Sequence, residues 1–248
     1  MAFGIPERQV GGSASMGTRS VLLANPNSNR STTDVLVRRL RRSMAALQPA
    51  AGAPNVVGVT ATTGPTMITT PRALAEAAGH IPDVVCGAVD RHRPDAVVIG
   101  GFGDPGVDRL QDCLTIPVIG IGEAAVRDAG CYGHRFGIAT TTGDLVEQLV
   151  QLVRKTALTD AFTGVEVTTS EPLRLAGLPQ LSCDELAGAV ERALAHGAEK
   201  VIIGGGPLSS ASDHLELLFP GVIVDPISAA ARWAVQLTQT GTSPKSMG

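Results

Sequence analysis

Aromatic residues are scarce in this 248-residue sequence, since phenylalanine, tryptophan and tyrosine together make up 3% of it. Hydrophobic residues still account for 44%, and 29 residues are glycine. The core must therefore be built from valine, isoleucine, leucine and alanine, a composition typical of parallel sheets buried on both faces. A chain of this length forms one large domain or two small ones and buries a sizeable core.

An excess of positive charge is also missing. The formal net charge is −3 and the isoelectric point is near 5.9, which argues against a nucleic-acid-binding surface. The dense basic cluster Arg38-Arg39 with Arg41-Arg42 is interpreted as the solvated face of the first helix. We therefore expect no nucleic acid among the partners.

Paired cysteines and long apolar runs are absent as well. Cys86, Cys113, Cys131 and Cys183 form no Cys-x-x-Cys pair, and none has a histidine at metal-ligand spacing. Scattered cysteines are typical of reduced core residues, so we expect neither disulfides nor a metal site. No apolar run approaches the roughly 20 residues that span a bilayer, and residues 1–18 lack the apolar segment of a secretory signal. We expect a cytoplasmic protein without a membrane partner.

The most informative stretch is AVVIGGFGDPGVDRLQDCLTIPVIGIGE, residues 96–123. Its first apolar run ends in a glycine-rich turn, Gly100–Gly106, and a short amphipathic segment and a second apolar run follow. This pattern indicates a strand, a loop, a helix and a strand, with the loop where open α/β sheets place their ligands. A similar segment, KVIIGGGPLSS, occupies residues 200–210. We interpret the two segments as an internal repeat that encloses one cleft between two glycine-rich loops.

Strands and helices alternate along the chain, which predicts parallel sheets with right-handed connections. The predicted fold class is α/β, with two pseudo-symmetric parallel-sheet lobes and the site between them. The expected strands are 20–24, 55–60, 96–99, 117–121, 135–139, 164–168, 201–203 and 222–224. The expected helices are 32–47, 71–80, 84–91, 107–114, 123–129, 144–156, 183–196 and 227–237, with a loop at 173–178.

The predicted domain organisation has four parts. Residues 20–120 and 222–237 form the first α/β lobe, and residues 121–221 form the second. The last predicted helix would thus return to pack on the first half of the chain. Residues 1–19 form a disordered leader and residues 238–248 a disordered tail, as their glycine, serine and threonine content predicts.

Several segments resemble hydantoin racemases. They are NPNS at 25–28, GDPG at 103–106, PVIGIGEAA at 117–125, RFGIATT at 135–141 and IIGG at 202–205. These enzymes belong to the aspartate/glutamate racemase superfamily, which also includes arylmalonate decarboxylase and maleate isomerase, and the resemblance runs from about Ser20 to Leu237. It implies two lobes related by approximate two-fold symmetry, an active site between them, no cofactor or metal, and a homo-oligomer.

The sequence departs from the resembled family at two positions. Hydantoin racemases carry one cysteine in each glycine-rich loop, and the two thiols flank the α-carbon of the substrate. The aligned residues here are Gly101 and Gly205. Arylmalonate decarboxylases also have glycine at the first position but keep the second cysteine. We therefore expect no two-thiol mechanism, and Cys113 and Cys131 are not obvious replacements.

The glycine-rich loops keep another part of such a site. Glycine lets a ligand approach backbone N–H groups closely, and a strand–loop–helix junction directs N–H groups at an anion. A carboxylate or an enolate could therefore be held in each loop. The expected substrate-binding residues are Asn25, Gly101, Phe102, Gly103, Thr140, Thr141, Gly205, Gly206, Leu208 and Ser210.

Asp104, Ser209 and His214 are the candidate catalytic residues. Asp104 is alternatively an N-cap for the helix that begins near Val107, and Ser209 is alternatively another helix cap. His214 could be a base, or it could be an ordinary surface or core histidine. For Asn25, at the end of a strand, an amide that faces a ligand and a plain turn are equal alternatives.

Residues 101–106 also match the GxGxxG pattern of dinucleotide-binding proteins, with Glu123 roughly twenty residues further on. However, the helix that follows is short, and Pro105 removes an N–H group from the loop. We therefore expect no dinucleotide and no other cofactor.

The leading functional hypothesis is a cofactor-independent isomerase, lyase or cyclase for a small carboxylate or a cyclic amide or imide. Its cleft would stabilise an oxyanion without paired thiols. Two alternatives stay open: a non-catalytic homologue that binds a small ligand, and an amino-acid or hydantoin racemase that uses another base.

Overall fold

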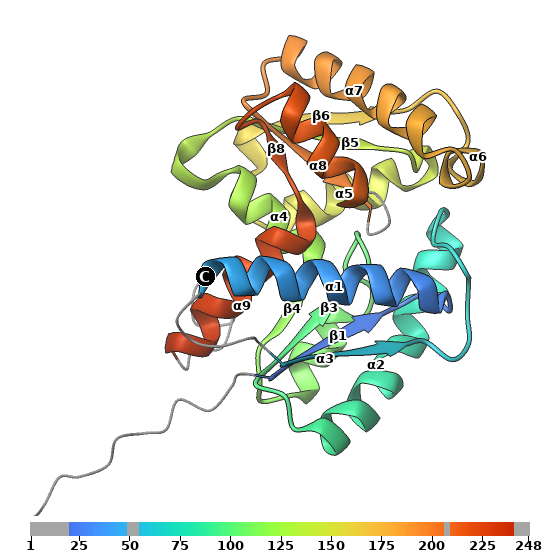
Figure 1. Ribbon diagram of the computed structural model, residues 1–248, viewed down its shortest axis with the longest axis vertical. Coiled ribbons are helices and arrows are strands. Elements are labelled where there is room, and N and C mark those ends of the chain that lie inside the picture. The colour runs from blue at the N-terminus through green and yellow to red at the C-terminus, as the bar shows by residue number, and fades with distance from the viewer. Residues whose placement is uncertain (1–19, 49–54, 206–208, 241–248) are drawn as a thin grey trace, which may run out of the picture.

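The computed structural model describes residues 20–48, 55–205 and 209–240, which form two four-stranded parallel sheets (Figure 1). The first sheet has the order β2-β1-β3-β4 and the second the order β6-β5-β7-β8, so the two orders match strand for strand. The prediction of two parallel-sheet α/β lobes is confirmed. The first sheet consists of β1 (Ser20–Asn25), β2 (Asn55–Thr60), β3 (Ala96–Ile99) and β4 (Val118–Gly120). The second consists of β5 (Phe136–Thr140), β6 (Phe162–Val167), β7 (Lys200–Gly204) and β8 (Ile223–Val224).

Helices cover both faces of the sheets, as the apolar strands require. The helices in the first half of the chain are α1 (Arg30–Leu47), α2 (Pro71–His92), α3 (Val107–Cys113) and α4 (Ile121–Ala129). Those in the second half are α5 (Val146–Arg154), α6 (Pro172–Ala176), α7 (Pro179–Ala195), α8 (Ser209–Leu218) and α9 (Pro226–Thr240). Short 3₁₀ helices are η1 (Cys131–Gly133), η2 (Gly143–Leu145) and η3 (Thr159–Ala161).

Side chains of successive residues of β1 lie on opposite faces of the first sheet, as the two-residue period of a strand dictates. Leu22 belongs to the buried cluster that includes residues of α2 and α3. Val21 and Leu23 belong instead to a larger cluster that also contains Phe136 and Ile202 of the second sheet. One continuous hydrophobic core therefore joins the two lobes.

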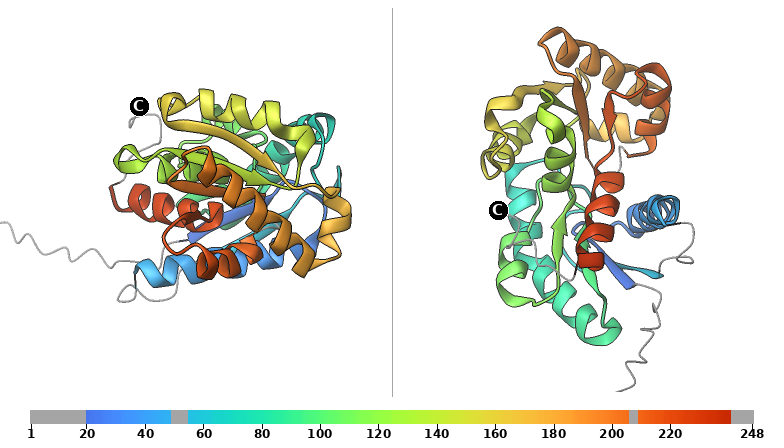
Figure 2. Two further views of the ribbon diagram at one scale, coloured as in Figure 1. Left: turned by 90° about the horizontal axis from the view of Figure 1, so that it is seen from above. Right: turned by 90° about the vertical axis from the view of Figure 1, so that its left-hand side faces the viewer.

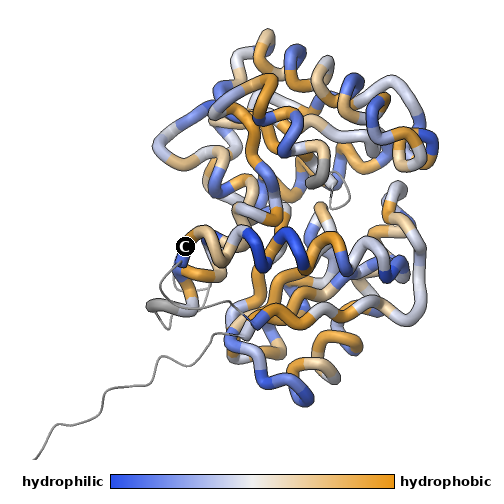
Figure 3. Tube along the Cα trace, in the orientation of Figure 1, coloured by the Kyte–Doolittle hydropathy of each residue, from blue (hydrophilic) through white to orange (hydrophobic). Residues whose placement is uncertain are grey.

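The helices α4 and α9 contribute to this shared core and lie between the two lobes (Figure 2). Hydrophobic residues follow the strands of both lobes, whereas the middle of α1 is strongly hydrophilic (Figure 3). That part of α1 holds Arg38, Arg41 and Arg42, which are exposed. The basic cluster is thus a solvated helix face, except for Arg39, which is only 16% exposed at its side chain.

Two predicted elements were wrong. The chain forms one helix, α2, where two helices were expected at 71–80 and 84–91, and Pro82 lies inside it. Proline in a helix interior costs about 3 kcal/mol, but Ile81, Val85 and Ala88 keep a single buried face through this point. Residues expected as a loop at 173–178 include most of α6, which begins with Pro172 at its first turn.

The predicted domain boundaries need two corrections. Residues 222–237 were assigned to the first lobe, but β8 at the start of this range pairs with β7 of the second sheet. The tail was expected to begin at 238, but α9 continues to Thr240. Residues 1–19 and 241–248 lie outside the described residues, so the leader and the rest of the tail stay predictions. No helix in the described ranges is long and apolar enough to cross a membrane.

Candidate active site

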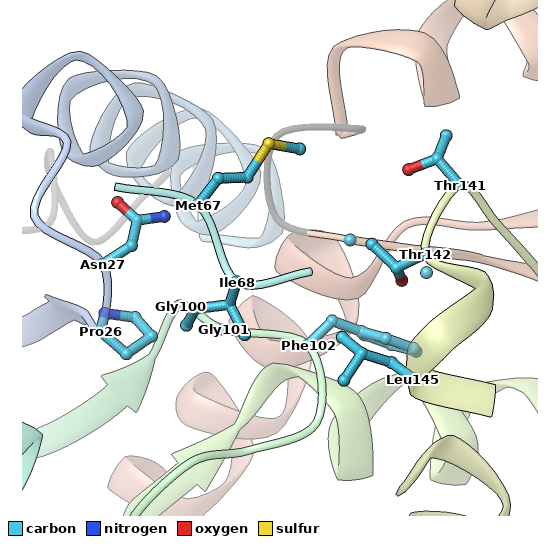
Figure 4. Close-up of a pocket in the computed structure, with 12 residues that line it drawn as sticks. Pro26, Asn27, Met67, Ile68, Gly100, Gly101, Phe102, Thr141, Thr142 and Leu145 are labelled. Atoms are coloured by element: carbon cyan, nitrogen blue, oxygen red, sulfur yellow. The ribbon is translucent and has the colours of Figure 1, made fainter. Parts of the chain in front are cut away.

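A cavity lies between the lobes, at the carboxyl ends of β1, β3, β5 and β7 (Figure 4). It is called the central cavity below, and its volume is about 60 Å³. The glycine-rich segment after β3 forms one wall, and Gly204 and Gly205 at the end of β7 belong to the opposite lobe. The two segments that the sequence repeat linked therefore meet at one site. The lining residues are Pro26, Asn27, Met67, Ile68, Gly100, Gly101, Phe102, Thr141, Thr142, Leu145, Gly204 and Gly205.

The structure favours glycine at the two positions that the resemblance aligns with cysteine. A Cβ atom on Gly101 would lie 2.5 Å from Cγ of Pro26, closer than two such atoms can approach, and 3.3 Å from Cδ of Pro105, which is a tight contact. Gly205 has a φ angle of +149°, a region that residues with a side chain rarely adopt. The cleft is therefore built around glycine at these two positions.

Asn27, and not the predicted Asn25, faces the central cavity. Asn25 is fully buried, and its Nδ2 lies 2.9, 3.0 and 3.0 Å from Oδ1 of Asn27, the carbonyl of Asn29 and Oγ1 of Thr33. Oδ1 of Asn27 also accepts from the N–H of Asn29, which fixes the orientation of the Asn27 amide. Its Nδ2 group is thereby directed into the cavity as a donor (Figure 4). Asn25 therefore stabilises the turn and orients Asn27. Of the two alternatives for Asn25, a ligand-facing amide and a turn residue, the structure favours the turn residue.

The predicted threonines after β5 divide into a structural and a cavity-lining group. Thr140 is fully buried, and its hydroxyl donates to the carbonyl of Gly204 at 2.8 Å. Because that proton is used, the Thr142 hydroxyl must donate to Oγ1 of Thr140 at 2.9 Å, which leaves the Thr142 oxygen as an acceptor. Thr141 lines the cavity, and its hydroxyl has no hydrogen-bond partner among the described residues.

Asp104 does not face the central cavity. Its carboxylate accepts from the N–H groups of Gly122 and Glu123, both at 2.7 Å, and so caps the first turn of α4. The cap that the sequence suggested was on α3, the helix that follows Asp104, but the N-cap of α3 is Gly106. Burial raises the pKa of the Asp104 carboxyl to about 7, although the two N–H hydrogen bonds act to lower it. We conclude that Asp104 ties the glycine-rich loop to α4.

The remaining predicted site residues lie apart from the cavity or cannot be placed. His214 is exposed on α8 and does not line the cavity, which favours its alternative as a surface histidine. Gly103 lines a different cavity, together with Asp104. Ser209 and Ser210 begin α8, but their side chains are outside the described part of the chain, as are Gly206 and Leu208. Gly101, Phe102, Thr141 and Gly205 line the cavity as expected.

None of the described residues that line the central cavity is titratable. The four cysteines lie elsewhere, with Cys113 and Cys131 exposed. Hydrogen-bonding capacity comes from the Asn27 amide, the Thr141 and Thr142 hydroxyls, and backbone N–H groups. Those of Gly101 and Phe102 donate to no residue that the structure describes. Such a site can bind a carbonyl or an anion, but its described walls hold no thiol, imidazole or carboxyl group.

Sequence reasoning missed several lining residues. Asn27 stood in the same NPNS segment as Asn25, and only the turn geometry decides which amide faces inward. Met67 and Ile68 come from the loop that follows β2, and Leu145 comes from η2. No sequence pattern distinguished these three from ordinary core residues.

No group of three or more histidine, cysteine, aspartate or glutamate residues within the described ranges is placed to hold a metal ion. This finding concerns the described residues only.

Comparison with known proteins gives consistent matches over almost the whole chain. A hydantoin racemase from Paenarthrobacter aurescens is 26% identical over 222 residues, which are 89% of this chain and 92% of that protein. The structure of an allantoin racemase from Klebsiella pneumoniae matches with a TM-score of 0.81 at 23% identity, covering 93% of this chain and 91% of the other. For an allantoin racemase from Pseudomonas fluorescens the TM-score is 0.80 at 25% identity, with coverages of 90% and 92%. The model of the Asp/Glu/Hydantoin racemase family matches residues 21–234, and the chain belongs to this family.

Proposed function

We propose that this protein is a cofactor-independent, isomerase-type enzyme that acts on a small cyclic amide or imide, or on a small carboxylate. It would stabilise an enolate-like oxyanion in the central cavity without a pair of thiols. Membership of the racemase family supports the reaction type. The absence of titratable side chains from the described lining of the cavity supports a mechanism without thiols.

The polar groups of the cavity suit an amide. Asn27 offers a donor from the first lobe, and the Thr142 oxygen offers an acceptor from the second. An amide presents a carbonyl acceptor next to an N–H donor, so one ring could use both groups. The N–H groups of Gly101 and Phe102 are additional donors for a carbonyl oxygen whose negative charge increases during the reaction.

In the proposed reaction the bond between the α-carbon and its hydrogen breaks, and its electron pair moves to the neighbouring carbonyl oxygen. Water takes the proton, since no described side chain in the lining can do so, and water returns a proton to either face of the enolate. Losing one oxyanion donor typically costs about 10²–10³ in rate. The donors would thus supply most of the catalysis.

The test is deuterium incorporation from D₂O, followed by NMR, on hydantoins, amino acids, malonates and unsaturated diacids. We expect exchange at an α-carbon and a decrease of at least about tenfold in the Thr141→Val variant, because this change removes a hydroxyl that lines the cavity and can donate to the developing oxyanion. Because the Thr141 hydroxyl has no partner among the described residues, this change removes a cavity group without breaking a described hydrogen bond. Thr159→Val, an exposed change in η3, is the matched control.

A separate experiment, cysteine alkylation, tests whether the proposed activity depends on thiols. Alkylation of the exposed Cys113 and Cys131 should leave the exchange rate unchanged, because neither residue lines the cavity. A loss of exchange on alkylation would instead support a racemase that recruits another cysteine.

A second candidate function is ligand binding without turnover, and the absence of titratable groups from the described lining favours it. Thermal stabilisation by a hydantoin or a carboxylate, without exchange or product, would support this alternative. A homo-oligomer is a further proposal, which light scattering during gel filtration would test.

A further inference from the structure

A second and larger cavity adjoins the central one. It has a volume of about 320 Å³ and lies between the loop that leads into α2 and the segment after β6. In Figure 1 this is where α6 faces the segment that leads into α2. Thr141 lines both cavities, so they are neighbours at this residue.

Thr141 also provides an unused polar group at the junction. Thr141 as a whole is 3% exposed, and its hydroxyl makes no hydrogen bond to any residue that the structure describes. A hydroxyl that lines a cavity and makes no hydrogen bond to a described residue is free to pair with a ligand or with water. The junction of the two cavities is thus prepared for a polar atom of a ligand.

The wall formed by the segment after β6 accepts hydrogen bonds and has few protons left to donate. Glu185 on α7 accepts from the hydroxyl of Thr169 at 2.9 Å and from that of Ser170 at 2.5 Å. The hydroxyl of Thr168 donates to the carbonyl of Ser170 at 3.5 Å. All three hydroxyl protons are therefore used, and the oxygens remain as acceptors toward a ligand.

The carboxyl group of Glu185 stays ionised over the physiological pH range. The hydrogen bonds from Ser170 and Thr169 lower the pKa of the Glu185 carboxyl to about 2. The hydroxyls of Thr169 and Ser170 consequently stay turned toward a carboxylate at neutral pH. The wall does not change from acceptor to donor between pH 5 and pH 8.

Charge in the larger cavity has one sign. Asp144 in η2 and Glu171 before α6 line it, and none of its described lining residues is basic. Both acidic residues are exposed, and neither forms an ion pair with another residue in the described ranges. A ligand group that both donates hydrogen bonds and carries a positive charge would complement this lining.

We propose that the larger cavity binds an ammonium- or guanidinium-bearing substituent of the substrate whose reacting end occupies the central cavity. This inference rests on the proposed function and specifies its substrate class. The sizes agree with it, because a cavity of about 60 Å³ suits the compact reacting group and one of about 320 Å³ suits a longer chain. The substituent would pass Thr141, whose hydroxyl oxygen can accept from it.

The test compares three hydantoins by calorimetry: 5-(4-aminobutyl)hydantoin, 5-pentylhydantoin and 5-methylhydantoin. The first two differ by an ammonium group in place of a methyl group. We expect the aminobutyl probe to bind about fivefold or more tightly than the pentyl probe, since each exposed charge pair contributes a factor of about 1.5 to 5. The preference should shrink in high salt, because exposed charges are screened.

Variants of the two acidic lining residues test whether the preference for the aminobutyl probe over the pentyl probe arises in this cavity. Asp144→Asn and Glu171→Gln should each reduce it, and the double variant should remove it while leaving 5-methylhydantoin binding unchanged. Glu147→Gln, a change of an exposed carboxylate on α5 outside the cavity, is the matched control. A preference that survives in the double variant would overturn the proposal.

The two proposals fail in different ways. If the three hydantoins bind equally, the cationic subsite is wrong and the proposed function stands. If no hydantoin binds, butylammonium is titrated against butanol while the backbone amide signals of Thr169 and Ser170 are followed by NMR. Selective shifts with butylammonium would support the subsite even if the proposed function fails, and the absence of shifts would overturn it.

Discussion

Gly101 fits the cleft only as glycine, because the ring of Pro26 occupies the space that a side chain would need. Gly205 is constrained differently, through its backbone angle. The two positions that the sequence resemblance aligns with the racemase thiols therefore disfavour a side chain for independent reasons. Introducing cysteine at Gly101 would require Pro26 to move as well.

Gly101→Ala should lower the free energy of unfolding by about 1–3 kcal/mol, since the new methyl group overlaps Pro26. The double change Pro26→Ala with Gly101→Ala should cost less than the sum of the two single changes. Urea denaturation at equilibrium measures both.

Gly79→Ala in α2 is the matched control for this prediction. No atom lies within 4 Å of the Cβ that this change adds, so it should stabilise the helix by about 0.5–1 kcal/mol. Equal effects of alanine at Gly79 and at Gly101 would contradict the steric argument.

Asp104 makes the stability depend on pH. Burial raises the pKa of its carboxyl to about 7 from 3.8, so between these values the folded protein binds more protons than the unfolded chain. The free energy of unfolding should therefore fall as the pH rises from 5 to about 7, and then level off. Urea titrations at pH 5, 6, 7 and 8 measure this slope.

Asp104→Asn isolates the contribution of the carboxyl group. The difference in unfolding free energy between the native protein and this variant should fall by at least about 1 kcal/mol from pH 5 to pH 8. The carboxyl of Glu185 titrates well below this range and does not interfere. Parallel pH curves would show that Asp104 is ionised throughout.

Residue-level roles in the site were only partly predictable. The glycine-rich loops were found because apolar strands that end in glycine are visible in the sequence. For Asn25 and His214 the sequence left two alternatives open, because a side chain's direction depends on local hydrogen bonds and on the face of a helix. Asp104 was correctly suspected as a cap but on the wrong helix, since its partner α4 lies 18 residues further along the chain.

Elements were more predictable than residues. Each expected strand has a counterpart in the structure, because short buried apolar runs between turns have few alternatives. Two errors concern proline: Pro82 did not end α2, and Pro172 begins a helix where a loop was expected. The helix α8 was not predicted at all. Tertiary packing decides whether a helix continues through a proline, and local sequence does not record that packing.

The start of α1 depends on its N-cap. The side chain of Asn29 accepts from the N–H of Ser31 at 3.1 Å and from the Ser31 hydroxyl at 2.8 Å. Asn29→Ala should lower the free energy of unfolding by about 1 kcal/mol, whereas Asn29→Asp should preserve it. Thermal and urea denaturation test this pair, and equal losses in both variants would rule out capping as the cause.

At the scale of the whole molecule, Arg39 connects the lobes. Its guanidinium on α1 forms two hydrogen bonds of 2.9 Å with Asp213 on α8, and a third of 3.1 Å with Asp225, which precedes α9. Asp213 is 64% exposed at its side chain, but Asp225 is only 8% exposed. The contact with Asp225 is therefore the less screened of the two.

Arg39→Met should lower the free energy of unfolding by about 3–5 kcal/mol, because it leaves the buried carboxylate of Asp225 without its cation. Asp213→Asn should cost less than about 1 kcal/mol. Double-mutant cycles with Asp213→Asn and Asp225→Asn separate the two couplings. A coupling to Asp213 as large as that to Asp225 would contradict this assignment.

The packing of α9 against α1 has a consequence for synthesis on the ribosome. Leu36, Leu40 and Met44 of α1 share a buried cluster with Ala230 and Trp233 of α9. The first sheet is complete once residue 120 has emerged, but this cluster cannot close until the last helix has been translated. During the interval a nascent chain exposes apolar surface that chaperones bind. Release before α9 would yield a half-finished core prone to aggregation.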